Sequence, residues 1–169
     1  IKKDLTSLKE EIDVFTKEAA SEIHKALDEA NISNYSIDYR VKSIYSIHKK
    51  IQRKGMDSAK QLYDLFGIRI IVSDIEDCYK ALWIVHNLWN PLPNRFKDYI
   101  ALPKPNGYKS LHTTIIWLLK DFRKQPTEIQ IKTYEMKTYS EIWIAAHFEY
   151  KEKGSTMAQD IDWVRELKE

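Results

Sequence analysis

The chain is poor in the residues and segments that mark several common classes of protein. Its 169 residues include one cysteine, four glycines and five prolines. The single cysteine, Cys78, cannot form an intrachain disulfide and is typical of a reducing compartment, so we expect a cytoplasmic protein. No apolar run approaches the ~18 residues of a membrane span and no signal peptide is present, so we expect a soluble protein without a membrane partner.

An excess of charge of one sign is also missing. The net charge is only +2, so no global positive field would draw the protein onto nucleic acid, and direct nucleic-acid binding is not expected. The sequence has no Gly-rich phosphate loop of the Walker type and no nucleophile elbow, which argues against P-loop enzymes and against Ser-His-Asp catalysis. The five histidines are too scattered for the ligand spacing of a zinc site. Any basic or catalytic site must therefore arise from local clusters.

The residues that are present predict one α+β domain with a mixed sheet. Hydrophobic residues make up 43% of the chain, which is enough for a core. Apolar residues at three- and four-residue steps predict helices, and period-two alternation or β-branched runs predict strands. Strands and helices do not alternate strictly and an antiparallel hairpin comes late, so the sheet should be mixed. We expect helices over 1–30, 44–54, 57–65, 74–89 (capped by Asp74) and 134–150, strands over 35–41, 66–73, 111–119 and 127–133, and a polar turn at 120–126.

Two acidic residues stand on or beside expected strands. Asp64 comes just before the strand 66–73, and Glu128 lies on the strand 127–133, where it shares one face with Gln130 and Lys132. If these two strands are neighbours, both carboxylates can converge on one rim of the sheet. Such a pair suits Mg²⁺, which takes oxygen ligands and shares its shell with substrate phosphates. The alternative is that both are ordinary surface acids.

Basic residues cluster in two places. Arg40 and Lys42 are two apart on one strand face, with Lys50 on the helix that follows, and further basic residues crowd the stretch 95–109. Arg and Lys beside paired carboxylates are the usual equipment for polyphosphate substrates, because phosphoryl transfer depends mainly on charge neutralisation. The alternative is a solvated charged face.

The stretch PKPNGYKSLH carries an Asn-Gly turn. Asn106-Gly107 permits a left-handed backbone, and the two flanking prolines stiffen the approach. Such a loop could present Tyr108 for stacking on a planar base. Equally, the ring of Tyr108 could pack inward on the core. His112 follows the loop directly and could reach the same site.

Several motifs together resemble a known family. They read, in order, YRVKSIYSIHKKIQRK, LYDLFGIRIIV, LWNPLPNRFKDYIALPKPNGYKSLHTT, TEIQIKTYEM and IAAHFEYKEKG. From residue 38 to residue 154 the chain resembles the synthetase domain of RelA/SpoT-type (p)ppGpp synthetases. This resemblance implies a nucleotidyltransferase (polymerase-β-like) fold over 1–154, with 1–33 as an N-terminal helix packed on it and 155–169 as the start of a C-terminal helix. The tail is similar to long members, which implies a parent with a hydrolase domain before this region and regulatory domains after it.

The resemblance also implies a reaction and a set of residues. Family members transfer the β,γ-pyrophosphoryl group of ATP to the 3′-hydroxyl of GTP or GDP, with Mg²⁺ as cofactor, and make the stringent-response alarmone. A catalytically silent module that regulates a neighbouring hydrolase is the alternative. By position, catalytic and metal-binding roles fall to Asp64 and Glu128, ATP binding to Arg40, Lys42, Ser46, Lys50 and Arg69, and GTP or GDP binding to Arg95, Lys97, Lys104, Asn106, Tyr108 and His112.

Three local features refine the resemblance. The loop RFKD, with Arg95, Lys97 and Asp98, is the basic version of a family motif, which suggests a bifunctional parent and leaves both GDP and GTP as acceptors. Tyr39 stands where the family usually has Gly, and in a strand it should point away from Arg40. The connection over 119–126 is longer than usual and is expected to extend a hairpin away from the site.

Overall fold

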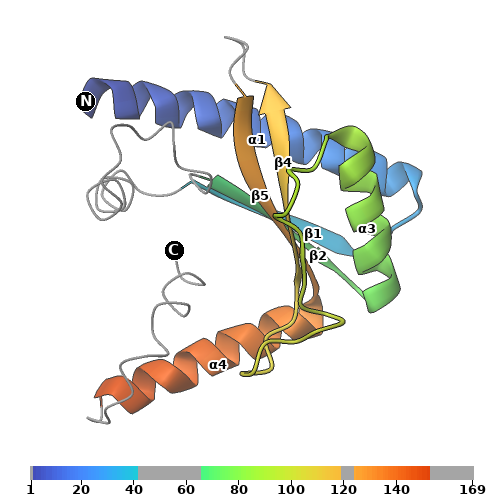
Figure 1. Ribbon diagram of the computed structural model, residues 1–169, viewed down its shortest axis with the longest axis vertical. Helices are drawn as coiled ribbons and strands as arrows, with labels where there is room; N and C mark the ends of the chain where they lie inside the picture. Colours follow the sequence, from blue (N-terminus) through green and yellow to red (C-terminus); the bar gives the residue numbers. More distant parts are fainter. Residues whose placement is uncertain (1, 42–65, 119–123, 153–169) are drawn as a thin grey trace.

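The protein is built on one five-stranded mixed sheet, seen in the computed structural model of Figure 1, which describes residues 2–41, 66–118 and 124–152. The strand order is β1-β2-β5-β4-β3. β2 and β5 run parallel, and the other neighbouring pairs are antiparallel. The fold is therefore α+β, as the sequence predicts. The strands are β1 (Tyr35–Val41), β2 (Phe66–Val72), β3 (Lys97–Asp98), β4 (Leu111–Leu118) and β5 (Lys124–Thr133).

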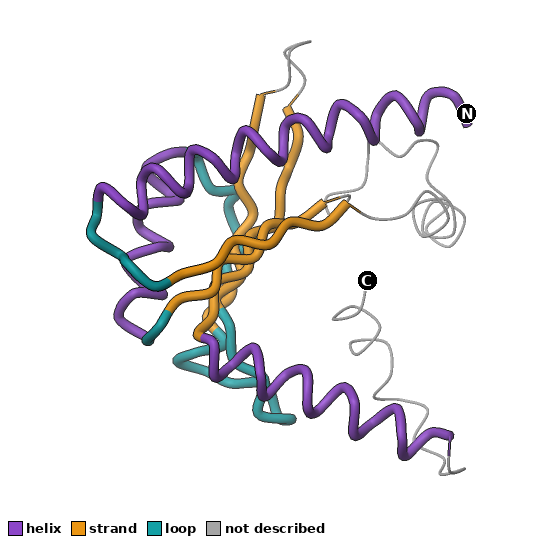
Figure 2. Tube along the Cα trace, turned by 180° about the vertical axis from the view of Figure 1, so that it is seen from behind, coloured by secondary structure: helices purple, strands orange, loops and turns teal. Residues whose placement is uncertain are grey.

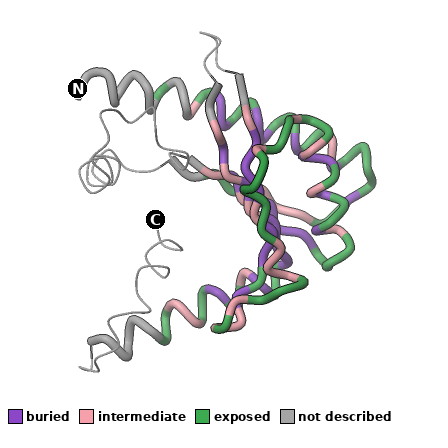
Figure 3. The backbone as a smooth tube through the Cα atoms, viewed as in Figure 1, coloured by how far each residue is buried: buried purple, intermediate pink, exposed green. Residues whose placement is uncertain are grey.

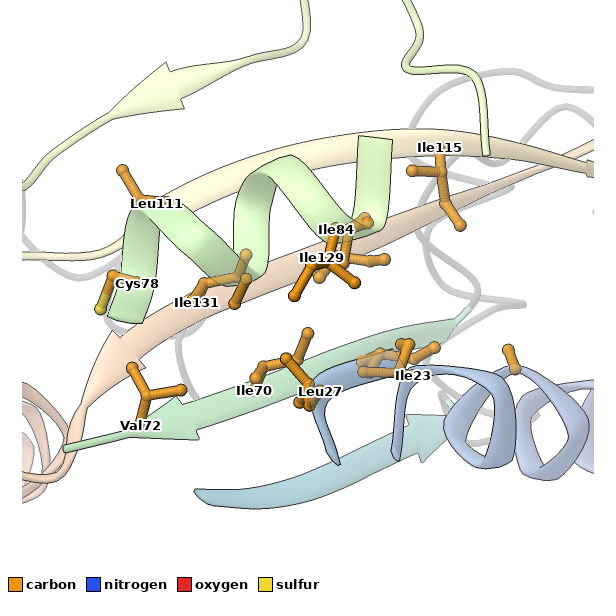
Figure 4. Packing of buried hydrophobic residues seen from close by; sticks show 14 of the residues in the cluster. Ile23, Leu27, Ile70, Val72, Cys78, Ile84, Leu111, Ile115, Ile129 and Ile131 are labelled. Atoms are coloured by element: carbon orange, nitrogen blue, oxygen red, sulfur yellow. The ribbon is translucent and has the colours of Figure 1, made fainter. Parts of the chain in front are cut away.

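Two helices cover one face of the sheet and form the core with it. These are α1 (Lys2–Glu29) and α3 (Ile75–Leu88), and Figure 4 shows their apolar side chains meeting those of the strands. Ile70 and Ile131 are fully buried in this layer. Full burial of such a side chain contributes roughly 1.5–3 kcal/mol relative to exposure. Figure 3 shows the same division, with buried positions along the strands and exposed positions along the loops.

A third helix leaves the opposite side of the sheet. α4 (Tyr134–Glu152) follows β5 without a break and runs away from α3, as Figures 1 and 2 both show. It packs beside the ends of β2 and β5. Of the described helices, α4 is thus the one that lies beside the sheet away from α1 and α3. None of the described helices is long and apolar enough to span a bilayer.

The ends of α3 follow from its sequence. Asp74 accepts a hydrogen bond from the Asp77 backbone N–H at 2.8 Å, which satisfies a donor that the first helical turn leaves free. At the other end the N–H of Trp89 donates to the Val85 carbonyl at 3.0 Å, and the helix stops before Pro91. The prediction of this helix and of its cap is confirmed.

The hairpin of β4 and β5 is extended, as the long connection predicts, and β5 begins earlier than the expected strand 127–133. Pairing continues to Leu118 and Lys124, so residues 124–126 belong to β5 and not to the expected turn at 120–126. A proline within a strand is tolerated here because its partner Ile116 directs its own N–H to Asn90, so the pair is one that exchanges no hydrogen bonds. The expected helices at 44–54 and 57–65 and the tail 155–169 lie outside the described residues.

Candidate active site

One polar residue from each strand forms a row across the face of the sheet away from α1 and α3. The register pairs Asp38 with Arg69, Arg69 with Gln130, Gln130 with His112, and His112 with Lys97. Directly paired residues project to the same side of a sheet, so all five side chains share this face. Ile129 and Ile131, which alternate with Gln130 on β5, are fully buried on the other face. The period-two prediction for this strand is confirmed.

Glu128 lies in the adjacent row, at the middle of the sheet. Its Cα partners are Gly67 on β2 and Thr114 on β4, and Gly67 in turn pairs with Arg40 on β1. Because Gly67 carries no side chain, no group of β2 stands between Glu128 and the strand of Arg40. The strands of Gly67 and Glu128 are thus neighbours, which is the condition under which the two acids could share one rim of the sheet. Asp64 itself lies outside the described residues.

Polar neighbours fix the Glu128 carboxylate, which is 34% exposed. Gln130 Nε2 donates to Glu128 Oε1 at 3.0 Å. His112 Nδ1 lies 3.5 Å from the same oxygen. Burial, with the charges of Lys132 and Lys104, lowers the pKa of His112 to about 3. The imidazole is therefore neutral at physiological pH, and this contact is not an ion pair.

Tyr108 lies inside the site and is only 2% exposed. Its hydroxyl is 2.8 Å from His112 Nε2 and accepts a hydrogen bond from Lys132 Nζ at 3.1 Å. The ring meets those of Tyr99 and His112 edge-on, and the ammonium groups of Lys104 and Lys132 lie over it at 5.5 Å and 4.6 Å from its centroid. Of the two arrangements that the sequence left open, presentation of the ring and inward packing, the structure has the inward packing. Stacking on guanine stays a prediction, and it requires the neighbours of the ring to move.

Two buried groups beside Tyr108 have shifted pKa values. Burial raises the pKa of the Tyr108 hydroxyl, so it stays a proton donor. Burial, with the charge of Arg69, lowers the pKa of Lys132 to about 7, against the opposing influence of Glu141 and Glu128. Strongly perturbed groups gathered on one polar face are typical of functional sites.

The turn at Asn106-Gly107 has the conformation that the sequence predicts. Gly107 has φ +82°, and a Cβ placed there would lie 2.5 Å from Tyr139 Oη. Tyr139, on α4, donates to the Asn106 carbonyl at 2.9 Å, while Asn106 Oδ1 accepts from the Tyr108 N–H at 3.1 Å. These contacts attach the loop to α4.

The loop RFKD divides into a structural acid and exposed bases. Asp98 accepts from the N–H groups of Ile100 and Ala101 at 3.0 and 2.8 Å and from the Tyr79 hydroxyl at 2.8 Å. Asp98 therefore shapes the loop, on which Arg95 and Lys97 are exposed at the surface.

The structure brings together only part of the predicted site. Glu128, His112, Tyr108 and Lys104 are in contact through the network above, and Arg69 and Lys97 lie in the same polar row. Tyr39 pairs with Ile68 of the core face, so it points away from Arg40 as expected. The sequence assigned no role to Gln130, Lys132 or Tyr99; the alternation of EIQIK placed the first two on the right face, but nothing indicated the third. Lys42, Ser46, Lys50 and the side chain of Arg40 lie outside the described residues, as does Asp64.

Comparison with known proteins assigns the chain to a family. The model of a region found in RelA / SpoT proteins matches residues 39–155, which include Glu128 and the whole loop before β4. The chain belongs to the RelA/SpoT family. A GTP pyrophosphokinase of Myxococcus xanthus is 40% identical over 168 residues, which are 98% of this chain and 21% of that protein. A guanosine-3′,5′-bis(diphosphate) 3′-pyrophosphohydrolase of Aquifex aeolicus is 44% identical over 148 residues, or 87% of this chain and 20% of that protein.

A solved structure supports the fold of this RelA/SpoT family member. Small alarmone synthetase 2 of Bacillus subtilis superposes with a TM-score of 0.67 at 30% identity, covering 98% of this chain and 88% of that one. The sheet described above is thus the nucleotidyltransferase-like sheet of alarmone synthetases. The chain spans about a fifth of the length of the two curated relatives named above.

Proposed function

We propose that this chain transfers the β,γ-pyrophosphoryl group of ATP to the 3′-hydroxyl of GTP or GDP, which yields AMP and pppGpp or ppGpp. The position of Glu128 is the main support. It lies on the central strand β5, with the predicted ATP-binding positions Arg40 and Arg69 on β1 and β2 to one side, and His112 and Lys97 on β4 and β3 to the other. A general base at this position would lie between the two bound nucleotides, where the 3′-hydroxyl of the acceptor must lose its proton.

In the proposed reaction the 3′-oxygen of the acceptor attacks the β-phosphorus of ATP. Glu128 takes the proton of that hydroxyl as the new O–P bond forms, and the bond from the β-phosphorus to the α,β-bridging oxygen breaks, so that AMP leaves. Gln130 orients the Glu128 carboxylate through its hydrogen bond to Oε1. Positioning and charge neutralisation supply most of the catalysis in such transfers.

The basic residues supply the neutralising charge in this proposal. Arg40, Lys42 and Lys50, with Ser46 and Arg69, would bind the ATP polyphosphate. On the acceptor side, the Lys104 ammonium lies over the Tyr99 and Tyr108 rings. These rings hold it in a position where it could bind a phosphate of GTP or GDP. Arg95 and Lys97 are exposed on the loop and β3, and Asn106 and Tyr108 are proposed to meet the guanine base.

The available residues suit a Mg²⁺ ion that binds together with the substrate phosphates. The described residues contain no group of three or more acidic, histidine or cysteine side chains able to cage a metal. Mg²⁺ is commonly held by one or two carboxylates together with phosphate oxygens and water, so Glu128 and Asp64 would be sufficient protein ligands. When bound, the ion would neutralise charge on the polyphosphate.

The proposal extends to the parent protein. One close relative is named as a pyrophosphokinase and another as a pyrophosphohydrolase, and both are about five times as long as the region they share with this chain. We propose that the parent carries a hydrolase domain before this region and regulatory domains after it. The cytoplasm, where ATP and guanine nucleotides are both at hand, remains the predicted location.

The test is direct synthesis. The purified chain is incubated with ATP, Mg²⁺ and either GTP or GDP, and the products are separated by anion exchange. Formation of AMP in equal amount with pppGpp or ppGpp is the expected result. Binding of both nucleotides without either product would instead favour the silent regulatory module.

A further inference from the structure

Lys132 is the least expected charged group on the polar face. It lies on β5 between Ile131 and Thr133 and is only 3% exposed. Lysine is almost never buried to this degree without a partner, because losing water around an ammonium is costly. In the part of the chain that the structure describes, its hydrogen-bond partner is the Tyr108 hydroxyl, and the charged groups around it are Arg69 of β2, Glu128 of β5 and Glu141 of α4. The proposed reaction gives Lys132 no role.

The hydrogen bond from Lys132 bears on the direction of the next one. Lys132 Nζ donates to the Tyr108 hydroxyl, so the phenol oxygen is the acceptor in that contact. The single proton of the phenol is then free to point to His112 Nε2, 2.8 Å away. In this arrangement Tyr108 donates to His112, and Nε2 is the unprotonated nitrogen of the ring.

The tautomer of His112 bears on Glu128. With Nε2 as acceptor, the proton of a neutral imidazole lies on Nδ1, and Nδ1 is 3.5 Å from Glu128 Oε1. An N–H dipole there attracts the carboxylate. In the other tautomer the lone pair of Nδ1 would face the same oxygen and repel it, and Glu128 would turn away from its place beside Gln130.

We propose that Lys132 is a positioning residue of the RelA/SpoT-type synthetase site: through the Tyr108 hydroxyl it holds His112 as the Nδ1–H tautomer and so keeps the Glu128 carboxylate in its reactive direction. The proposal rests on the proposed function for its catalytic meaning, but the chain from Lys132 to Glu128 is a property of the protein alone. It assigns Tyr108 a role for its hydroxyl that is separate from any stacking of its ring.

Two substitutions break the same hydrogen bond from its two ends. Lys132→Met keeps length and apolar volume but removes the donor, and Tyr108→Phe keeps the ring but removes the hydroxyl. Each should lower kcat about 10- to 100-fold with little change in either KM, the size expected for groups that orient a reacting residue. The double variant should be no slower than the slower single variant, because residues acting through one contact are not additive. Lys25→Met and Tyr134→Phe, on exposed positions of α1 and α4, are matched controls and should be unchanged.

An activity-independent measurement reads the tautomer itself. Nitrogen-15 NMR of the imidazole groups in the wild-type chain should show His112 protonated on Nδ1 alone, and the Tyr108→Phe spectrum should show the Nε2–H form or a mixture. Unchanged tautomers in Tyr108→Phe overturn the proposal. So does a rise in the acceptor KM with kcat kept, or a double variant whose losses multiply.

The two proposals can fail separately. If the wild-type chain makes no product, the synthetase assignment fails while the NMR experiment still decides the hydrogen-bond chain. If Lys132→Met does not fold, as judged by its thermal transition, Tyr108→Phe carries the kinetic test alone, since it removes one oxygen and leaves no cavity. Partial recovery of kcat in Lys132→Arg, which restores an N–H donor, is the expected rescue, and an Arg variant that folds and stays as slow as Met counts against the proposal.

Discussion

In the part of the chain that the structure describes, the Glu128 carboxylate is contacted by the Gln130 amide and the neutral His112 imidazole. Gln130 Nε2 donates to Glu128 Oε1, and His112 Nδ1 lies near the same oxygen. Neither neighbour has to lose a proton when the carboxylate takes one up. Because these neighbours orient the carboxylate without a change in their own charge, the arrangement suits the proposed role of Glu128 as a base.

Glu128→Gln should therefore separate chemistry from binding. The amide keeps the shape of the side chain but accepts no proton, so we expect transfer to fall by at least about 100-fold while ATP and the guanine nucleotide still bind. Calorimetric titration measures the affinities and anion exchange the product. Glu22→Gln, on the exposed side of α1, is the matched control. Lost affinity with transfer retained would contradict the assignment as base.

The buried Lys132 should also affect stability. Its folded pKa of about 7 lies below the 10.5 of a free lysine, so between these values the unfolded chain holds a proton that the folded chain lacks. The free energy of unfolding should then rise with pH over that window, with a slope up to about 1.4 kcal/mol per pH unit from this residue. Urea unfolding from pH 7 to pH 9 measures the slope. In Lys132→Met that contribution should vanish, and in Lys25→Met it should persist; equal slopes in all three proteins would show that Lys132 is not the source.

At the residue scale, the sequence identified candidate site residues and the face on which Glu128 lies, but it did not predict which residues surround Tyr108. Alternation on β5 predicted that Glu128 faces away from Ile129, because this depends only on local backbone geometry. The burial of Tyr108 depends on Tyr99, Lys104 and Lys132, which reach it from other parts of the chain. No local pattern contains that information.

Among the elements, the loop before β4 is held by one special turn. Gly107→Ala places a side chain at φ +82° and 2.5 Å from Tyr139 Oη, so both the backbone and the hydrogen bond from Tyr139 to Asn106 must give way. We expect a loss of at least about 1–2 kcal/mol in the free energy of unfolding, the penalty of the left-handed backbone alone. Urea denaturation measures it.

Gly67→Ala is the matched comparison on stability. Its added Cβ would meet only the Glu128 carbonyl oxygen at 3.5 Å, an ordinary contact, within a strand where Gly is not a favoured residue. It should therefore be neutral or slightly stabilising. If both alanine variants are equally stable, the turn at Gly107 is not under the constraint described.

Elements with strong local signals were predictable and weakly marked ones were not. α3 has a capping Asp74, apolar periodicity and a terminating proline, and its bounds were found almost to the residue. β3 consists of two residues, and it exists only because His112 and Leu111 lie opposite. The start of β5 was misplaced because Pro126 reads locally as a turn residue, whereas the partner strand accepts it.

At the scale of the whole molecule, stability and activity should respond differently to loss of metal. The described residues build their core from apolar side chains and contain no metal-binding cluster of three groups. A chelator should therefore abolish transfer and leave the thermal transition of the nucleotide-free protein unchanged, with added Mg²⁺ restoring transfer. Calorimetry and product assays on the same sample check both. A drop of several degrees on chelation would reveal a structural ion instead.

The sequence predicted a mixed sheet but not the order of its strands. Hydrophobic patterns identify strands, whereas the neighbour of each strand depends on which faces fit in space. The proximity of β2 and β5 entered only as the condition under which Asp64 and Glu128 could share one rim of the sheet, and their parallel pairing was not predicted.

The strand order has a consequence for the ribosome-bound chain. β5 is the last of the described strands to be synthesised, yet it is the central one, and in the described sheet it alone joins β1 and β2 to β4 and β3. Until residue 133 has left the exit tunnel, the nascent protein can hold only two separate ribbons, each with an unpaired edge available to other chains. Translation stalled in the hairpin before β5 would thus release an aggregation-prone fragment, whereas a few residues more complete both the sheet and the row of polar groups across it. Glu128, the proposed base, arrives with the strand that joins the two halves of the sheet, so a chain that ends before β5 lacks both this residue and the complete sheet.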